Sequence, residues 1–316
     1  MSTGWPGDSR MPGLPPLPDS VVIRDVGPRD GLQPERPVTP EDRVRLIEAL
    51  VAAGVRRIEA VAFVSPKAVP AMAGAAEVLT GVPRMGDLRY TALVPNVRGA
   101  QMALETDVDE LSVTISLSET YNQRNVKMSV DASVAEIEQI CGAAGTVPVD
   151  AVVSCAFGSP YEGELDRAAL IELVRRLRAV GCSAITCADT TGMATPRGIA
   201  VVVEAVGSDI GLHLHETRGT AMACAYAGLL LGVTRFDTSV GGLGGSPFAA
   251  GAAGNLATEG FVAMLDDLGV HSGIDVEALI EAASLVSELV GRALPSPVAA
   301  AGPRTRLAGP PGGGGR

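Results

Sequence analysis

Two of the three histidines, His213 and His215, lie two residues apart in a stretch that we predict to be a β-strand. Side chains two positions apart on a strand point to the same face, so both imidazoles would face one way while Leu212 and Leu214 face a helix layer. Two imidazoles at the end of a strand supply half of a metal site. The alternative interpretation is a pair of hydrogen-bonded histidines in the protein core.

A second segment of interest, Gly27–Gln33, follows the first predicted strand and places Arg29 next to Asp30. An Asp-Gly pair forms a turn through its own backbone preferences, which is the simpler interpretation. The same segment also puts a carboxylate that could ligate a metal beside a permanently charged guanidinium.

A third segment, Gly241–Asn255, is rich in glycine and follows the last predicted strand. It lacks the lysine of a Walker phosphate loop, and it is not a G-x-G-x-x-G turn after the first strand. So many glycines favour a loop that moves or lies close to a ligand. A purely structural connection remains the alternative.

The small numbers of lysine and histidine residues limit which catalytic mechanisms the chain can use. The chain has only Lys67 and Lys127. Neither lies in a predicted strand, where an imine-forming lysine would be desolvated and held. A Schiff-base aldolase is therefore disfavoured, and metal stabilisation of an enolate remains. A barrel metallohydrolase would draw further histidines from other strands, and only His271 is left.

Eight β-branched stretches alternate with helix-like stretches over about 270 residues, which predicts a parallel (β/α)8 TIM barrel rather than a doubly wound open sheet. The expected strands are Val21–Val26, Val55–Ala60, Leu88–Val94, Glu110–Ile115, Val149–Ala156, Ala184–Ala188, Ile210–His215 and Arg235–Val240. The expected helices include Pro40–Ala53, Val130–Ala144, Glu164–Val180, Pro196–Val206 and Arg218–Leu231. The catalytic groups of such barrels lie at the carboxyl ends of the strands, where all three segments fall.

Local signals support several of these boundaries. Thr39 and Thr195 each precede a proline, which pairs a capping hydroxyl with proline in the first helical turn. Gly54 and Gly181 lie where helices should stop. Residues 1–20 and 291–316 are rich in glycine and proline, so we expect disordered tails around one domain of residues 21–290 that ends in extra helices.

Composition excludes several classes of protein. The 316 residues carry 36 acidic and 25 basic side chains, a net charge of −11, and the isoelectric point is near 4.8. Nucleic acid and anionic membranes both require a basic surface, so neither is expected as a partner. We expect no secretory signal and no membrane span. Five cysteines without a C-x-x-C pair indicate reduced thiols in a cytoplasmic protein.

From about residue 21 to 290, the chain resembles the 3-hydroxy-3-methylglutaryl-CoA lyases, members of a metal-dependent TIM-barrel family of acyl-CoA lyases and synthases. The R-D-G-x-Q turn and the H-x-H pair are shared by the wider family. More particular to the lyases are FVSPK, PYEG and the GGLGG…GNLATE stretch. Further matching stretches are NVRGAQMA, SETYNQRNV, ADTTGMATP and LGVHSGIDV.

The resemblance implies a divalent cation, Mg²⁺ or Mn²⁺, held by Asp30, His213, His215 and Asn255. It further implies that Arg29 stabilises the enolate oxygen of the thioester, that Glu59 at the end of the second strand orients Arg29, and that Asp189 assists proton movement. His213 would act both as a ligand and in proton transfer. Residues implied to bind substrate or coenzyme A are Gln33, Arg36, Lys67, Lys127 and Arg218.

Two positions depart from the family pattern. Ser246 stands where the lyases carry a cysteine, and a serine hydroxyl is a far weaker acid than a thiol with a pKa of about 8.5. We therefore expect slower proton delivery to the enolate. Arg218 stands where the lyases show tyrosine, so it could meet an additional substrate carboxylate, or it could be an exposed cation at the start of a helix.

The implied activity is cleavage of 3-hydroxy-3-methylglutaryl-CoA, or a close 3-hydroxyacyl-CoA, to acetyl-CoA and a keto acid (acetoacetate) through the substrate alkoxide and an enolate. A lyase acting on citramalyl-CoA or a similar ester is the alternative within the class. An acyl-CoA-binding pseudoenzyme is the alternative outside it. By analogy with relatives, a homodimer is expected.

Overall fold

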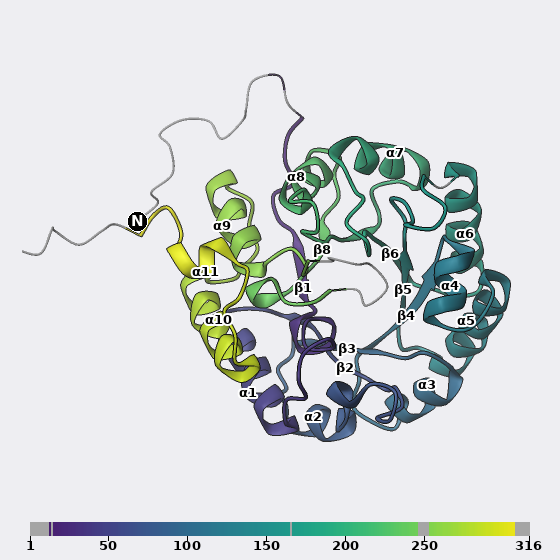
Figure 1. Cartoon of the computed structure of the whole chain (residues 1–316), viewed down its shortest axis with the longest axis horizontal. Helices are drawn as coiled ribbons and strands as arrows, with labels where there is room; N and C mark the ends of the chain where they lie inside the picture. Colours follow the sequence, from purple (N-terminus) through teal and green to yellow (C-terminus); the bar gives the residue numbers. More distant parts are fainter. Residues whose placement is uncertain (1–12, 14, 165, 246–252, 307–316) are drawn as a thin grey trace, which may run out of the picture.

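Eight parallel strands form a closed barrel in the order of the sequence (Figure 1). The computed structural model describes residues 13, 15–164, 166–245 and 253–306. The strands are β1 Val22–Asp25, β2 Arg57–Ala62, β3 Arg89–Leu93, β4 Glu110–Ser116, β5 Val149–Ser154, β6 Ala184–Ala188, β7 Gly211–His213 and β8 Arg235–Thr238. Because β8 pairs with β1 as well as with β7, the sheet has no edge. The predicted TIM barrel is confirmed.

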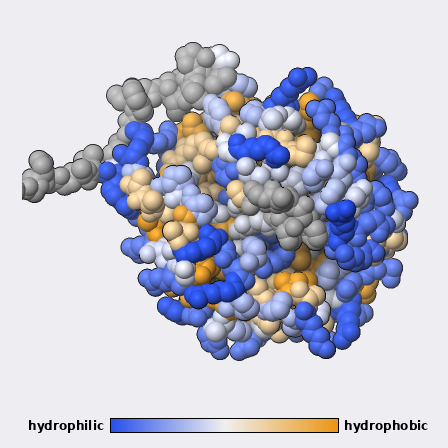
Figure 2. Space-filling model, in the orientation of Figure 1, coloured by the Kyte–Doolittle hydropathy of each residue, from blue (hydrophilic) through white to orange (hydrophobic). Residues whose placement is uncertain are grey.

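Helices surround the barrel, and the last three follow β8 and lie together on the left of Figure 1. They are α1 Pro40–Ala52, α2 Ala75–Gly81, α3 Val97–Leu104, α4 Glu119–Asn125, α5 Val130–Ala144, α6 Arg167–Ala179, α7 Pro196–Val206, α8 Ala221–Leu230, α9 Thr258–Leu268, α10 Val276–Val290 and α11 Pro297–Ala301. Figure 2 shows hydrophilic residues spread around the rim of the face seen in Figure 1. No helix in these described ranges is long and apolar enough to cross a membrane.

Local sequence signals account for the helix ends. The Thr39 side chain accepts a hydrogen bond from Asp42 N at the start of α1, and Thr195 accepts one from Gly198 N at the start of α7. Gly54 and Gly181 follow α1 and α6 with φ of +103° and +108°, a conformation that favours glycine. These capping predictions are confirmed.

Several predicted boundaries are wrong by two or more residues, including the following three. The eighth helix begins at Ala221 rather than Arg218, because Gly219 takes φ of +69° and interrupts the helical backbone. α6 begins at Arg167 rather than Glu164, because the Asp166 side chain caps it by accepting from Ala168 N. β7 ends at His213, and His215 instead forms an isolated antiparallel bridge with Asn255.

Parts of the two segments predicted to be tails contact the barrel domain in the described residues. Ser20 forms a bridge with His271, next to the start of β1. Beyond residue 290, α11 is capped by the Ser296 hydroxyl, and a Cβ added at Gly241 would lie 2.2 Å from Leu294. Residues 291–306 therefore contact the barrel through Leu294, an apolar side chain that a count of glycine and proline overlooks.

Candidate metal centre and active site

Arg29 and Asp30 lie on η1 (Gly27–Gly31), a single π-helical turn directly after β1. The buried Asp25 carboxylate holds this turn in place by accepting from Gly27 N at 2.8 Å. Gly31 is required there, since a Cβ at that position would lie 2.7 Å from the Ser239 hydroxyl. The segment is thus a turn whose geometry aims two charged side chains into the barrel.

The two histidines face each other at the end of β7, with Nε2 atoms 3.1 Å apart. Each ring is held by its other nitrogen: His213 Nδ1 lies 3.2 Å from Asp237 Oδ2, and His215 Nδ1 lies 3.2 Å from the Ala253 carbonyl oxygen. A carbonyl oxygen only accepts hydrogen bonds, so the proton of a neutral His215 is on Nδ1 and its Nε2 presents a lone pair. Burial, followed by the charge of His213, lowers the pKa of His215 to about 4.

Asp30 and Asn255 complete the cluster. The ligand atoms of Asp30, His213 and His215 all lie within 4.8 Å of one another. Asn255 Nδ2 donates to Asp30 Oδ2 at 2.8 Å and to the Leu243 carbonyl at 2.9 Å. Burial acts to raise the pKa of Asp30, but the charges of Arg29 and His213 outweigh it and lower that pKa, which keeps the ligand ionised.

Two features show that these residues fit a bound divalent cation. The buried Asn255 Oδ1 atom has no hydrogen-bond partner, although buried polar atoms are nearly always paired. The facing Nε2 atoms of His213 and His215 would also repel each other unless a proton or a cation lay between them. A carboxylate, an amide oxygen and two imidazoles are hard and borderline ligands of the kind that divalent cations take. The predicted ligands are therefore brought to one place.

Arg29 is held between two carboxylates. Its Nε donates to Glu59 Oε2 at 2.6 Å, and its Nη1 donates to Asp30 Oδ1 at 2.8 Å. Glu59 is itself fixed, since its Oε1 accepts from the Ser112 hydroxyl at 2.5 Å. Glu59 lies inside β2 rather than at its end, a correction to the prediction, and a shift in strand register directly follows it. The guanidinium is thereby oriented beside the metal cluster.

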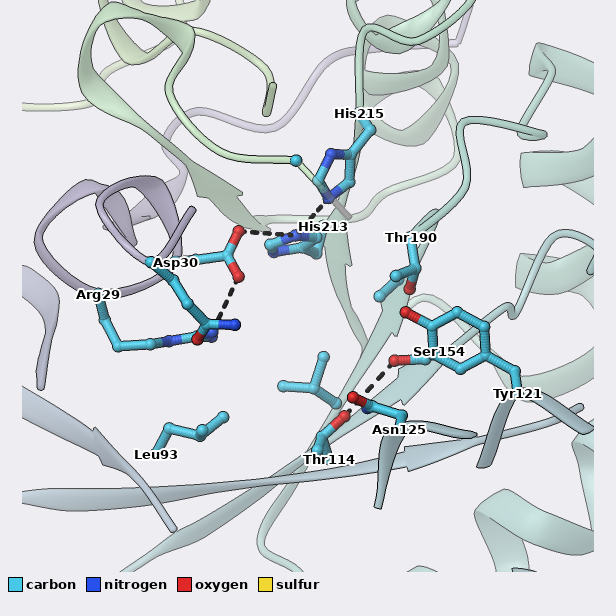
Figure 3. Close-up of a pocket in the computed structure, with 14 residues that line it drawn as sticks. Arg29, Asp30, Leu93, Thr114, Tyr121, Asn125, Ser154, Thr190, His213 and His215 are labelled. Carbon is cyan, nitrogen blue, oxygen red and sulfur yellow. Dashed lines mark hydrogen bonds and ion pairs between the residues drawn. The ribbon is translucent and has the colours of Figure 1, made fainter. Parts of the chain in front are cut away.

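Arg29, Asp30, His213 and His215 border a cavity of about 140 Å³ at the mouth of the barrel. In Figure 3, Asp30, His213 and His215 lie on one side, and Thr114, Ser154, Asn125 and Tyr121 lie on the other. The full lining is Arg29, Asp30, Gln33, Leu93, Thr114, Tyr121, Asn125, Val152, Ser154, Ala188, Thr190, His213, His215 and Gly245. One side of the cavity is charged and would hold a substrate bound to the metal. The other side consists of hydroxyl and amide groups.

Sequence reasoning missed the hydroxyl and amide side. Thr114 and Ser154 are polar residues within the predicted strands β4 and β5, and their hydroxyl oxygens lie 3.5 Å apart. Polar side chains inside otherwise apolar strands were the signal that could have identified them. Tyr121 and Asn125 come from α4, which was not predicted as a helix.

Asp189 directly follows β6, between Ala188 and Thr190, which line the cavity. Its Oδ1 accepts from Met193 N at 2.6 Å and from Ala194 N at 2.9 Å, whereas its buried Oδ2 has no partner. Burial raises the pKa of Asp189 to about 7. The carboxyl group is therefore tied to its own loop through one oxygen and has the other free.

Of the residues expected to bind substrate or coenzyme A, Gln33 lines the cavity and the four cations do not. Arg36 donates to the Leu289 carbonyl of α10, and Lys127 Nζ donates to the Arg124 carbonyl. Arg218 donates to the carbonyls of Thr191 and Gly192, and Lys67 is exposed between β2 and η2 (Pro70–Met72). Ser246 lies outside the described residues.

Comparison with a family model and with named proteins shows similarity over most of this chain. The family model HMGL-like matches residues 20–286. A Pseudomonas aeruginosa protein named 3-hydroxy-3-isohexenylglutaryl-CoA/hydroxy-methylglutaryl-CoA lyase is 40% identical over 87% of this chain and 95% of its own length. The mitochondrial hydroxymethylglutaryl-CoA lyase of Bos taurus is 39% identical over 90% of each chain.

A solved structure is similar as well. It is an Acinetobacter baumannii HMG-CoA lyase in complex with coenzyme A and 3-methylmalate. It is 39% identical, has a TM-score of 0.88, and matches over 93% of this chain and 98% of its own. Sequence and fold thus agree over nearly the whole described chain.

Proposed function

Because this chain belongs to the HMGL-like family, we propose that it is a divalent-metal-dependent carbon–carbon lyase for 3-hydroxy-3-methylglutaryl-CoA or a close 3-hydroxyacyl-CoA. The products are acetyl-CoA and a keto acid, which is acetoacetate when the substrate is 3-hydroxy-3-methylglutaryl-CoA. One observation carries the proposal: Asp30, His213, His215 and Asn255 converge beside Arg29 at the mouth of the barrel.

These four side chains would hold Mg²⁺ or Mn²⁺, and the bound ion would supply Lewis-acid chemistry that eases deprotonation of the substrate's tertiary hydroxyl. The steps that follow involve the substrate and the side chains of this chain. When the hydroxyl proton leaves, the carbonyl of the keto acid forms as the neighbouring C–C bond breaks. The electron pair of that bond passes to the acetyl-CoA fragment as an enolate, which then takes up a proton.

Arg29 would stabilise the negative thioester oxygen of that enolate, and the hydrogen bond to Glu59 supports this role by orienting the guanidinium. His213 and Asp189 are the groups near the cavity that we assign to proton movement, and Asp189 has one unpaired oxygen available. Ser246 would assist in place of the family's cysteine. Gln33 is the one residue of the expected substrate-binding set that borders the cavity.

The test is dialysis of the purified protein against a chelator, followed by addition of Mg²⁺ or Mn²⁺ with a panel of hydroxyacyl-CoA esters that includes the citramalyl ester. Free acetyl-CoA is followed. We expect no product from the metal-free protein and product from 3-hydroxy-3-methylglutaryl-CoA after either metal is restored. Metal binding without turnover of any ester would instead indicate an acyl-CoA-binding pseudoenzyme.

We further propose that the protein works in the cytoplasm and forms a homodimer. The cytoplasmic assignment is supported by the five cysteines, all of which are free thiols without a disulfide bond. Sedimentation of the full chain tests the dimer.

A further inference from the structure

A buried cluster of charges lies in the barrel interior on the side of His213 away from the cavity. Arg24 of β1 is at its centre: Nε and Nη2 donate to the two oxygens of Asp237 at 2.8 Å and 2.9 Å. The same guanidinium lies 2.8 Å from Asp150 Oδ2 and 3.1 Å from Glu110 Oε1. Asp237 is thus contacted through both oxygens by an arginine that also contacts Asp150 and Glu110.

Asp237 connects this cluster to the metal site, since its Oδ2 lies 3.2 Å from His213 Nδ1. A carboxylate that receives two guanidinium N–H groups acts as a hydrogen-bond acceptor, so the Nδ1 atom of His213 must be the donor. In the neutral ring, donation from Nδ1 leaves the lone pair of His213 on Nε2, which is the atom that faces His215 and Asp30.

We propose that Asp237 is the positioning residue of the metal site, fixing the Nδ1–H form and the ring orientation of His213, with Arg24 holding Asp237 in place. The inference rests on the proposed metal-dependent function. The partners of the two histidines differ in charge: His215 donates to a neutral carbonyl, whereas His213 donates to a carboxylate. An anionic partner makes an imidazole a stronger ligand, and losing such a partner typically costs 10- to 100-fold in metal affinity.

The chain offers a matched control for the test. Asp150 flanks the same arginine at the same 2.8 Å and is equally buried, but its partners are Arg24 and Thr186 rather than a histidine. Mn²⁺ binding is measured by electron paramagnetic resonance for the wild type, Asp237→Asn and Asp150→Asn. We expect 10- to 100-fold weaker Mn²⁺ binding in Asp237→Asn and less than about a threefold change in Asp150→Asn. Equal losses, or no loss in Asp237→Asn, would overturn the proposal.

A second measurement needs no variant at the cluster. With only three histidines, ¹⁵N-histidine spectra of the full chain contain three rings, and His271→Gln removes the one distant from the site. We expect His213 to carry its proton on Nδ1 in the metal-free protein. A spectrum with the proton on Nε2 alone contradicts the inference. If the wild type binds no Mn²⁺, the proposed function fails, and the spectra still decide the role of Asp237.

An independent observation concerns two cysteines remote from the cavity. Cys141 on α5 and Cys182, just before β6, have Sγ atoms 3.9 Å apart. Cys182 is buried and Cys141 is partly exposed. Gly181 allows this approach, because a Cβ there would lie 3.2 Å from the Cβ of Cys141. The two thiols therefore meet at the amino end of β6, whereas the cavity lies at the carboxyl end.

We infer that Cys141 and Cys182 form an oxidisable pair that hydrogen peroxide converts to a disulfide. The Cys141 thiolate attacks one peroxide oxygen, giving a sulfenic acid and water once a proton is taken up. The Cys182 sulfur then attacks the sulfenic sulfur and expels the second water. Two thiols and one peroxide thus become one disulfide and two waters.

The full chain is treated with peroxide, its free thiols are counted in denaturant, and disulfide-linked peptides are identified by mass spectrometry. We expect the five thiols of the wild type to fall to three, with a linked Cys141–Cys182 peptide, and to recover with dithiothreitol. In Cys182→Ser, which has four thiols, we expect oxidation of Cys141 to the sulfenic acid without a cross-link. Cys224→Ser is the control that still forms the bond. In the wild type, peroxide that leaves all five thiols, or that oxidises Cys141 without a cross-link, overturns the inference.

Discussion

Asn255 donates from its Nδ2 to Oδ2 of Asp30 across 2.8 Å, although 225 positions separate the two residues in sequence. Both amide hydrogens of Asn255 are used, one by Asp30 and one by the Leu243 carbonyl. The amide is therefore oriented, and its unpaired Oδ1 atom is left as a ligand. A neighbouring Gly244 is required, since a Cβ there would lie 2.3 Å from Asn255 Nδ2.

The first prediction concerns that amide. Asn255→Ala removes the oxygen ligand and the support of Asp30, so we expect Mn²⁺ affinity to fall at least tenfold, with a parallel loss of acetyl-CoA formation. Asn96→Ala, which removes only the cap of α3, serves as the control. Unchanged metal affinity in Asn255→Ala would remove Asn255 from the ligand set.

A second prediction concerns the orientation of Arg29. Arg29→Lys keeps the charge but cannot contact Glu59 and Asp30 together, so we expect kcat to fall roughly 10²- to 10³-fold. Glu59→Gln should lower kcat less and leave Mn²⁺ affinity nearly unchanged. Since both residues act through one guanidinium, the double variant should be little worse than Arg29→Lys. Additive losses in steady-state kinetics would show that they act separately.

Arg218 provides a third prediction. Its guanidinium donates to the backbone carbonyls of Thr191 and Gly192 at 3.0 Å and 2.7 Å. That contact joins the loop after β6 to the loop after β7. We expect Arg218→Tyr to leave the ranking of hydroxyacyl-CoA substrates unchanged and to lower the free energy of unfolding by about 1 kcal/mol. A changed ranking would return Arg218 to the substrate-binding set and favour the citramalyl ester.

The fourth prediction addresses Ser246. A cysteine thiol exchanges a proton near neutral pH far more readily than a serine hydroxyl does. Ser246→Cys should therefore raise turnover of 3-hydroxy-3-methylglutaryl-CoA severalfold, while Ser246→Ala measures what the hydroxyl contributes. If the cysteine variant turns over at the wild-type rate, the proton reaches the enolate by another route.

A fifth prediction concerns stability against pH. Burial raises the pKa of Glu110 from 4.5 to about 7. The folded protein then holds a proton that the unfolded chain has lost, so unfolding free energy falls as pH rises from about 4.5 to 7. The slope per such group is at most about 1.4 kcal/mol per pH unit. Glu110→Gln should flatten this dependence in denaturant titrations, and an unaltered slope would refute the assignment.

Prediction from sequence succeeded where the information is local. Alternation of β-branched and helical patterns indicated the eight strands, and the boundaries of α5 and α7 agree with the structure. A threonine followed by proline identified the starts of α1 and α7. The presence of only two lysines and three histidines was enough to favour a metal-dependent mechanism over one with an imine intermediate.

Prediction was weaker for long side chains on loops. Arg36 and Arg218 have the charge to bind phosphates or carboxylates, but both donate to backbone carbonyls at the ends of helices or loops. A cation's sequence position does not say which acceptor it will reach. Asp237 was missed for the same reason: a buried aspartate in a strand shows no sign of its partner until β7 and β8 pair, which sets His213 beside it.

By itself, the sequence determined the barrel, because strand and helix periodicity and helix caps depend on residues close together in the chain. It also determined which residue types were available as ligands. Only the tertiary structure decided that Asp30 and Asn255 touch, that His213 is backed by Asp237, and that Arg218 contacts backbone. Those pairings arise from closing eight strands into one ring, which brings together side chains that no local pattern connects.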